Sequence, residues 1–93
     1  MRDKDDSKVF IGKKKSMVYV MAAMVVLTER PVKLLARGKS ISRAVDVAEI
    51  TINKFVKGTS YGEIEIGTET LTNTDGSISN VSSISIEILP AQK

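Results

Sequence analysis

The chain has 93 residues, which fits one domain built around a single hydrophobic core. It contains neither cysteine nor histidine, and this excludes disulfides, thiolate nucleophiles, zinc sites and catalysis by imidazole. Residues 1–57 hold 13 of the 14 Lys and Arg but 6 of the 11 Asp and Glu, a balance of +7 against −4 for residues 58–93. We therefore expect a binding protein with one positively charged side, and neither an enzyme nor a protein with a metal or another cofactor.

The N-terminal third begins with charged residues and continues into the longest apolar run of the sequence. Residues 1–7 lack apolar anchors, so we expect a disordered tail followed by one domain over residues 8–93. Residues 8–11 predict a short strand, and residues 17–27 predict a helix that is too short to span a bilayer. A signal peptide is the alternative, but the upstream strand and the lack of a clear cleavage site argue against it. We expect no membrane partner, and a helix so apolar on all sides to be buried by its own sheet and by a second subunit.

The rest of the sequence predicts a strand, a second helix and a hairpin. Residues 32–36 predict an apolar strand, and residues 40–57 predict a helix from the spacing of its apolar residues. Those residues are Ile41, Ala44, Val45, Ala48, Ile52 and Phe55. Residues 61–72 and 81–89 alternate apolar and polar side chains on either side of an Asp75-Gly76 turn. The order β-α-β-α-β-β predicts an α/β (α+β) domain, with two helices on a four-stranded mixed sheet and a protruding C-terminal hairpin.

Two basic segments occur where a predicted strand leads into a helix. They are Gly12-Lys13-Lys14-Lys15 and Ala36-Arg37-Gly38-Lys39. If the two strands are neighbours, all these cations meet at one edge of the sheet, and the glycines would let the backbone approach a phosphate closely. One lysine run alone could equally be a solvated surface, but two at equivalent positions favour phosphate contact. Neither segment has the glycine spacing of a nucleotide-binding loop, so we predict a nucleic acid as the ligand.

The acidic residues do not suggest a catalytic or metal site. Glu63, Glu65 and Glu69 fall on one face of a predicted strand, where we expect them to be solvated. Asp46 and Glu49 lie one turn apart on the second helix and are expected to pair with neighbours on its surface. Without histidine or a second acidic cluster, neither set completes a metal or acid-base site.

At the level of motifs, the sequence closely resembles the Alba family of archaeal chromatin proteins. The resemblance rests on Val9-Phe10-Ile11-Gly12-Lys13-Lys14 and on Ala36-Arg37-Gly38-Lys39-Ser40-Ile41-Ser42-Arg43-Ala44-Val45-Asp46, and it extends from about Lys8 to Leu89. It implies a fold similar to the C-terminal domain of translation initiation factor three. It also implies a cytoplasmic, nucleoid-associated homodimer that binds double-stranded DNA and RNA, mostly without sequence preference. The alternative is an RNA-binding subunit of a ribonucleoprotein such as an RNase P-like complex.

The resemblance and the charge pattern together predict roles for individual residues. The expected nucleic-acid-binding residues are Lys13, Lys14, Lys15, Arg37, Lys39, Arg43 and Asn80. The resemblance implies acetylation of Lys13, which would weaken phosphate binding. It also implies a dimer-dimer contact at Phe55, although the helical spacing of Phe55 equally suits a core residue. Lys15 replaces a proline that is usual in the family, and Asn80 stands where an arginine is common. The hairpin would therefore reach along the minor groove through hydrogen bonds instead of charge.

Overall fold

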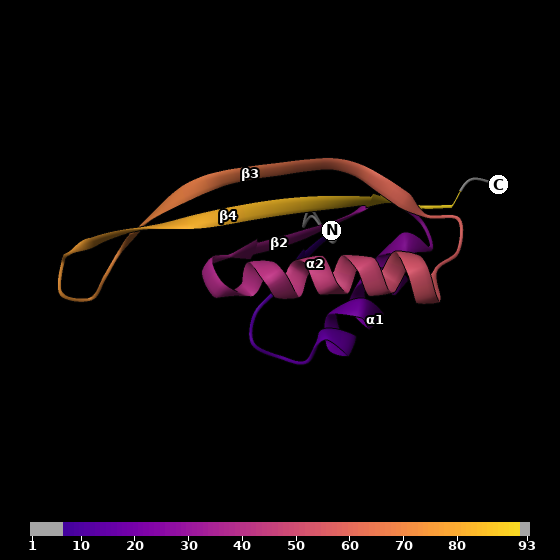
Figure 1. Cartoon of the computed structure of the whole chain (residues 1–93), viewed down its shortest axis with the longest axis horizontal. Helices are drawn as coiled ribbons and strands as arrows, with labels where there is room; N and C mark the ends of the chain where they lie inside the picture. The colour runs from indigo at the N-terminus through magenta and orange to yellow at the C-terminus, as the bar shows by residue number, and fades with distance from the viewer. Residues whose placement is uncertain (1–6, 92–93) are drawn as a thin grey trace, which may run out of the picture.

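The predicted order of elements is the order found in the computed structural model of the protein, which describes residues 7–91 (Figure 1). The tail predicted for residues 1–7 lies outside these residues except for Ser7. The elements are β1 (Lys8–Phe10), α1 (Ser16–Leu27), β2 (Val32–Arg37), the 3-10 turn η1 (Gly38–Ser40), α2 (Ile41–Ile50), the π-helical turn η2 (Thr51–Phe55), β3 (Ser60–Thr72) and β4 (Ile78–Leu89). Figure 1 shows both helices on one side of the sheet and the β3–β4 hairpin extending beyond them.

The four strands form one mixed sheet in the order β1-β2-β4-β3. β1 and β2 run parallel, with α1 as the crossover between them, and β4 is antiparallel to both of its neighbours, β2 and β3. This topology confirms the predicted fold class. It also makes the carboxyl ends of β1 and β2 neighbours, so both basic segments leave the sheet at the same edge.

The core lies between the sheet and the two helices. In β2, Val32, Leu34 and Ala36 are buried beneath the helices, while Lys33 and Leu35 alternate onto the opposite face, which carries no helix. The buried hydrophobic residues are Val9, Ile11, Tyr19, Val20, Ala23, Leu27, Val32, Leu34, Ala36, Ala44, Val47, Ala48, Ile86 and Ile88. They come from β1 and the residue after it, α1, β2, α2 and β4, whereas β3 lies at the edge of the sheet and leaves its apolar side chains outside this core.

The second helix differs from the prediction at both ends. It begins as the 3-10 turn η1 and ends as the π-helical turn η2, in which the Val56 N–H donates to the Thr51 carbonyl over 2.9 Å. Bonding from i to i+5 adds a residue to the turn and rotates the residues after it away from the stripe of α2. Phe55 accordingly is 45% exposed, so the interpretation of Phe55 as a core residue is wrong.

Helix α1 is buried on only one side. Tyr19, Val20, Ala23 and Leu27 face the core, whereas a second apolar face remains exposed. This α1 face comprises Val18, Met21 and Val25. The expected burial by the chain's own sheet is therefore confirmed for one side of the helix, and burial of the other side by a second subunit stays a prediction.

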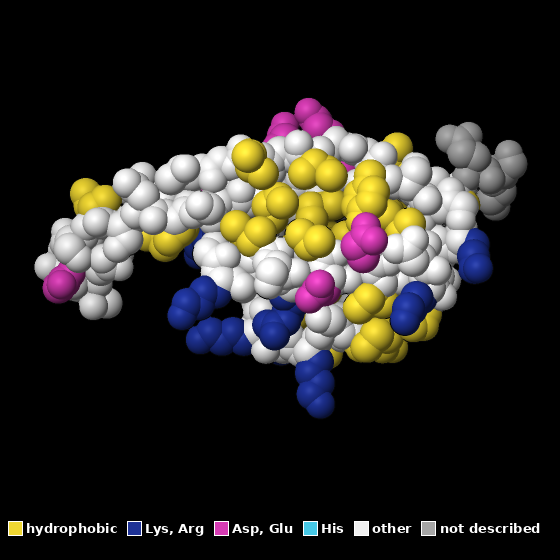
Figure 2. All heavy atoms as spheres, in the orientation of Figure 1, with side chains coloured by type: hydrophobic (Ala, Val, Ile, Leu, Met, Phe, Trp, Pro, Cys, Tyr) yellow, Lys and Arg dark blue, Asp and Glu magenta, His cyan; other side chains and the backbone are white. Residues whose placement is uncertain are grey.

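A larger apolar surface lies between α2 and β3, and we call it the isoleucine patch. Its members are the exposed Val45, Tyr61, Ile64 and Ile66 and the half-buried Ile41 and Ile84. Ile64 and Ile66 pair across the sheet with Ile86 and Ile84, and cross-strand partners share a face, so these side chains lie on the helix side of the sheet. In Figure 2 yellow side chains cover the middle of the molecule between β3 and α2. The two helices leave this part of the sheet uncovered.

The hairpin projects from the body as an arm, which we define as residues 68–83. β3 and β4 remain paired as far as Thr72 and Ile78, so β4 begins three residues earlier than predicted. At the tip the Gly76 N–H donates to the Asn73 carbonyl over 3.0 Å, which confirms the predicted turn. The Ser77 N–H and hydroxyl both donate to the Asp75 carboxylate, which lowers the pKa of Asp75. The tip is thus ordered by its own hydrogen bonds.

Candidate nucleic-acid interface

The lysine loop, residues 12–15, and Lys39 present cations at one end of the sheet. Lys13, Lys14, Lys15 and Lys39 are all exposed, and within residues 7–91 none of them has an acidic partner. Figure 2 shows dark blue side chains projecting along the lower left of the body, where Figure 1 places this loop and the first turn of the second helix. The structure therefore brings Lys39 of the second basic segment to the same edge as the lysine loop, as the sequence predicted, whereas the side chain of Arg37 lies elsewhere.

The lysine loop is held in shape by Tyr19, a buried residue of α1. Its hydroxyl oxygen accepts hydrogen bonds from the Gly12 N–H at 2.9 Å and from the Lys14 N–H at 3.0 Å. A Cβ atom at position 12 would lie 3.3 Å from this oxygen, so glycine allows the close approach of the phenol. These backbone donors thus serve Tyr19, and the expectation that Gly12 brings its backbone to a phosphate is replaced by a positioning role.

Arg43 also contacts this loop. From α2, its Nη1 donates to the Gly12 carbonyl over 3.0 Å, and the side chain is half-buried. Arg43 was predicted as a nucleic-acid ligand, and the structure adds a structural task that sequence reasoning missed. The only prior signal for the loop anchors was a tyrosine within an otherwise aliphatic run of residues 17–27.

Replacing Tyr19 by phenylalanine is expected to loosen the lysine loop without changing the charge. Two part-buried N–H groups lose their acceptor, so the free energy of unfolding should fall by about 1–3 kcal/mol. Nucleic-acid affinity should fall about 3- to 10-fold, because the lysines lose their preorganised positions. Thermal unfolding and fluorescence anisotropy measure both effects. Tyr61→Phe, which removes a phenolic hydroxyl outside the lysine loop, is the matched control. Equal changes in the two variants would contradict the role of Tyr19 in holding the loop.

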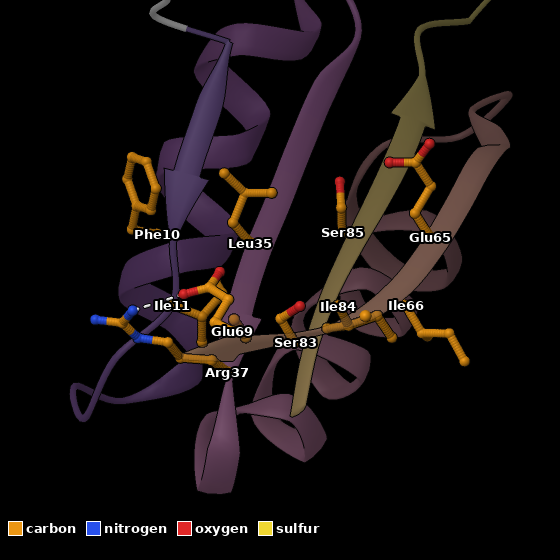
Figure 3. Close-up of a pocket in the computed structure, with 12 residues that line it drawn as sticks. Phe10, Ile11, Leu35, Arg37, Glu65, Ile66, Glu69, Ser83, Ile84 and Ser85 are labelled. Atoms are coloured by element: carbon orange, nitrogen blue, oxygen red, sulfur yellow. Dashed lines mark hydrogen bonds and ion pairs between the residues drawn. The ribbon is translucent and has the colours of Figure 1, made fainter. Parts of the chain in front are cut away.

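Arg37 takes a different direction from the lysines. It ends β2 just before Gly38, whose φ of +59° requires glycine, and its side chain lies on the helix-free face of the sheet. There its Nη1 donates to Oε1 of Glu69, on β3, at 2.7 Å. Figure 3 shows this pair beside Phe10, Leu35 and other residues that line a shallow hollow of about 630 Å³. Glu69 is exposed on this face as expected, but the sequence did not predict its ion pair with Arg37.

The arm presents hydrogen-bonding groups and no cations. Residues 68–83 contain neither lysine nor arginine. The Thr70 hydroxyl donates to Oδ1 of Asn80 over 3.2 Å, which fixes the side-chain amide across the two strands. Within the described residues the Nδ2 donors of Asn80 have no partner and remain open to a ligand.

The other acidic residues form surface contacts. Glu49 accepts a hydrogen bond from Nδ2 of Asn53 at 3.0 Å, as the helical spacing predicted, and another from the Tyr61 hydroxyl. The pKa of Tyr61 is raised to about 12, mainly by partial burial and to a smaller extent by this hydrogen bond and the negative charge of Glu49. In residues 7–91 no group of three or more acidic side chains could hold a metal ion. The same residues include no helix long and apolar enough to cross a membrane.

The fold and the exposed lysines define a small α/β domain with a positively charged edge, and comparison with known proteins identifies its family. The sequence profile of the Alba family matches residues 7–68. A relative from Thermoplasma acidophilum is 48% identical over 86 residues, covering 90% of this chain and 96% of its own. Another from Nitrosopumilus maritimus is 50% identical over 82 residues, covering 86% of each chain. The chain belongs to the Alba family.

The solved structures agree with this membership. The structure of Alba from Thermoplasma volcanium has a TM-score of 0.82 and 46% identity, covering 88% of this chain and 98% of that chain. An Alba protein from Trypanosoma brucei, at 22% identity, shares the fold with a TM-score of 0.76, covering 97% of this chain and 74% of its own. The relatives from Thermoplasma acidophilum and Nitrosopumilus maritimus are named DNA/RNA-binding protein Alba. Those names describe binding proteins, in agreement with the prediction that the chain is not an enzyme.

Proposed function

We propose that this chain forms a homodimer that binds double-stranded DNA and RNA, mostly without regard to base sequence, and organises the nucleoid. The observation that carries the proposal is the cluster of exposed lysines at the joined ends of β1 and β2, which have no acidic partner in residues 7–91. Lysine ammonium groups bind backbone phosphate as point charges and do not read bases. The names of the relatives support a nucleic acid as the polyanion.

The isoleucine patch supports the homodimer. Val45, Tyr61, Ile64 and Ile66 are each more than a third exposed, although they adjoin the buried Ile86 and the helix face of the sheet. A contiguous apolar surface on a small domain is typical of a protein interface. A second copy that covers this patch about a two-fold axis would give each dimer two lysine loops and two arms.

Assembly of dimers along a nucleic acid requires another surface, and Phe55 lies on one. It belongs to η2, which packs against α1, whose exposed α1 face is also apolar. We assign Phe55 and this face to dimer-dimer contact. Acetylation of Lys13 would remove one charge from the lysine loop and weaken phosphate binding, as expected for a regulated chromosomal protein.

A salt titration tests the binding mode. We assume that each protomer neutralises one phosphate with each of four residues, Lys13, Lys14, Arg37 and Lys39. The dimer then makes about eight contacts, which give a slope of log K against log salt concentration of about −7. Fluorescence anisotropy with a short duplex of mixed sequence, compared with a second duplex of different sequence, measures the slope and the sequence dependence. A slope near zero would overturn the proposal.

The same titration with a folded RNA separates chromosome organisation from the ribonucleoprotein alternative. Similar affinities for duplex DNA and RNA at one salt concentration are expected from phosphate contacts alone. Binding to folded RNA that is more than about tenfold tighter would favour the ribonucleoprotein subunit, since such a preference needs recognition of RNA shape or 2′-hydroxyl groups.

A further inference from the structure

The ion pair between Arg37 and Glu69 lies where the arm leaves the body. Arg37 ends β2 beside the lysine loop, and Glu69 is on β3 in the first part of the arm. Between them, on β4, is Ser83, which pairs with both Arg37 and Gly67 in the sheet. A nucleic acid that contacts both the lysine loop and the helix-free face of the arm would therefore pass close to this pair.

Glu69 neutralises Arg37 in the unbound protein. The two side chains are about half exposed, at 56% and 48%, so both the guanidinium and its partner can be reached from solvent. The contact uses Nη1 only, whereas a phosphate could bind an arginine fork through two parallel hydrogen bonds. A phosphate that approaches Arg37 meets the Glu69 carboxylate as well and must displace it or bear its repulsion.

We propose that Glu69 is an intramolecular competitor of nucleic-acid phosphate for Arg37, and that it holds down the affinity of the protein for polyanions. The proposal rests on the proposed function, because it needs a phosphate ligand at this edge. Glu69 would lower the affinity for nucleic acid, whereas the cations raise this affinity. The lysines bind without such competition, since within residues 7–91 they have no acidic partner.

The strand offers a charge-matched control. Glu65 lies on the same strand and the same face as Glu69, with no register shift between them, and in the described part of the chain it has no ion-pair partner. Four residues of strand separate the two by about 13 Å, which exceeds the screening length of about 8 Å at physiological salt. Glu65→Gln therefore removes the same charge without freeing Arg37.

The test compares duplex affinity of Glu69→Gln and Glu65→Gln at one salt concentration. Glu69→Gln should bind about 2- to 20-fold more tightly than wild type, the range that two exposed ion pairs in a dimer imply, and Glu65→Gln should change less than about twofold. In an Arg37→Gln background Glu69→Gln should have no effect beyond that of Glu65→Gln. Circular dichroism verifies folding, and Glu69→Thr, which suits a strand, is the second variant.

Several outcomes would overturn the inference. Equal effects of the two glutamate variants, or a gain from Glu69→Gln that persists without Arg37, would mean that only the net charge matters. If either result is obtained while the wild-type protein still binds duplex through Lys13 and Lys14, the competitor role of Glu69 fails but the proposed function stands. If wild type binds no duplex and no RNA, both fail together.

Discussion

Replacing Lys13 and Lys14 together by alanine is expected to weaken duplex binding roughly 100- to 1,000-fold near physiological salt. The two side chains project from a loop whose backbone is held by Tyr19 and Arg43, so the backbone that carries them is in place before the ligand arrives. A dimer loses four of about eight phosphate contacts, and the slope of log K against log salt should change from about −7 to about −4. Anisotropy titrations over a range of salt concentrations measure both numbers.

The matched control is the double variant Lys54→Ala with Lys57→Ala. These lysines are also exposed, lie at the other end of the second helix and carry the same charge. Their removal should leave the slope within about one unit of the wild-type value, because distant charges are screened. If both double variants lose affinity equally, the lysine loop has no special role and the proposed interface is wrong.

Ile66→Glu is expected to convert the dimer into a monomer. Ile66 is 82% exposed in the single chain, so the change should leave the protomer folded. In a two-fold dimer the substitution occurs twice and would take two carboxylates out of water, which should weaken dimerisation roughly 100-fold or more. Light scattering after size-exclusion chromatography should show a mass of one chain, 10.1 kDa, instead of two.

Ile78→Glu provides the comparison for this variant. Ile78 is also an exposed isoleucine, at 68%, but it lies at the tip of the arm and outside the isoleucine patch. It should leave the dimer mass unchanged. A dimer that persists with Ile66→Glu would mean that another surface, such as the α1 face, joins the two chains.

The sequence predicted the fold and the location of the basic segments because both depend on local patterns. Alternation in residues 61–72 and 81–89 and the helical spacing after Gly38 were enough to give the order of elements, which the sheet topology confirms. The rule that parallel strands end at one edge then brought Lys13 and Lys39 together. The motifs around Gly12 and Gly38 also sufficed to identify the family, which the comparisons confirm.

The contacts that shape the site were not predictable from these patterns. Arg37 and Glu69 are 32 positions apart, and their pairing depends on the register of three strands. The bonds from the lysine loop to Tyr19 depend on how the loop closes over α1. Ile64 is exposed because the two helices do not cover its part of the sheet, and Phe55 is exposed because it lies in a π-helical turn. Neither feature alters the apolar periodicity of the sequence.

β4 is a single strand that belongs both to the core and to the arm. Its C-terminal half holds Ile86 and Ile88 in the core, and its N-terminal half forms one side of the arm, with an unbroken register to β2 and β3 from Ser83 to Ile86. This continuous pairing predicts that the arm does not bend where it joins the core. In the proposed dimer the two arms would therefore keep a fixed separation, and a nucleic acid that contacts both arms would have to adjust its own shape to them.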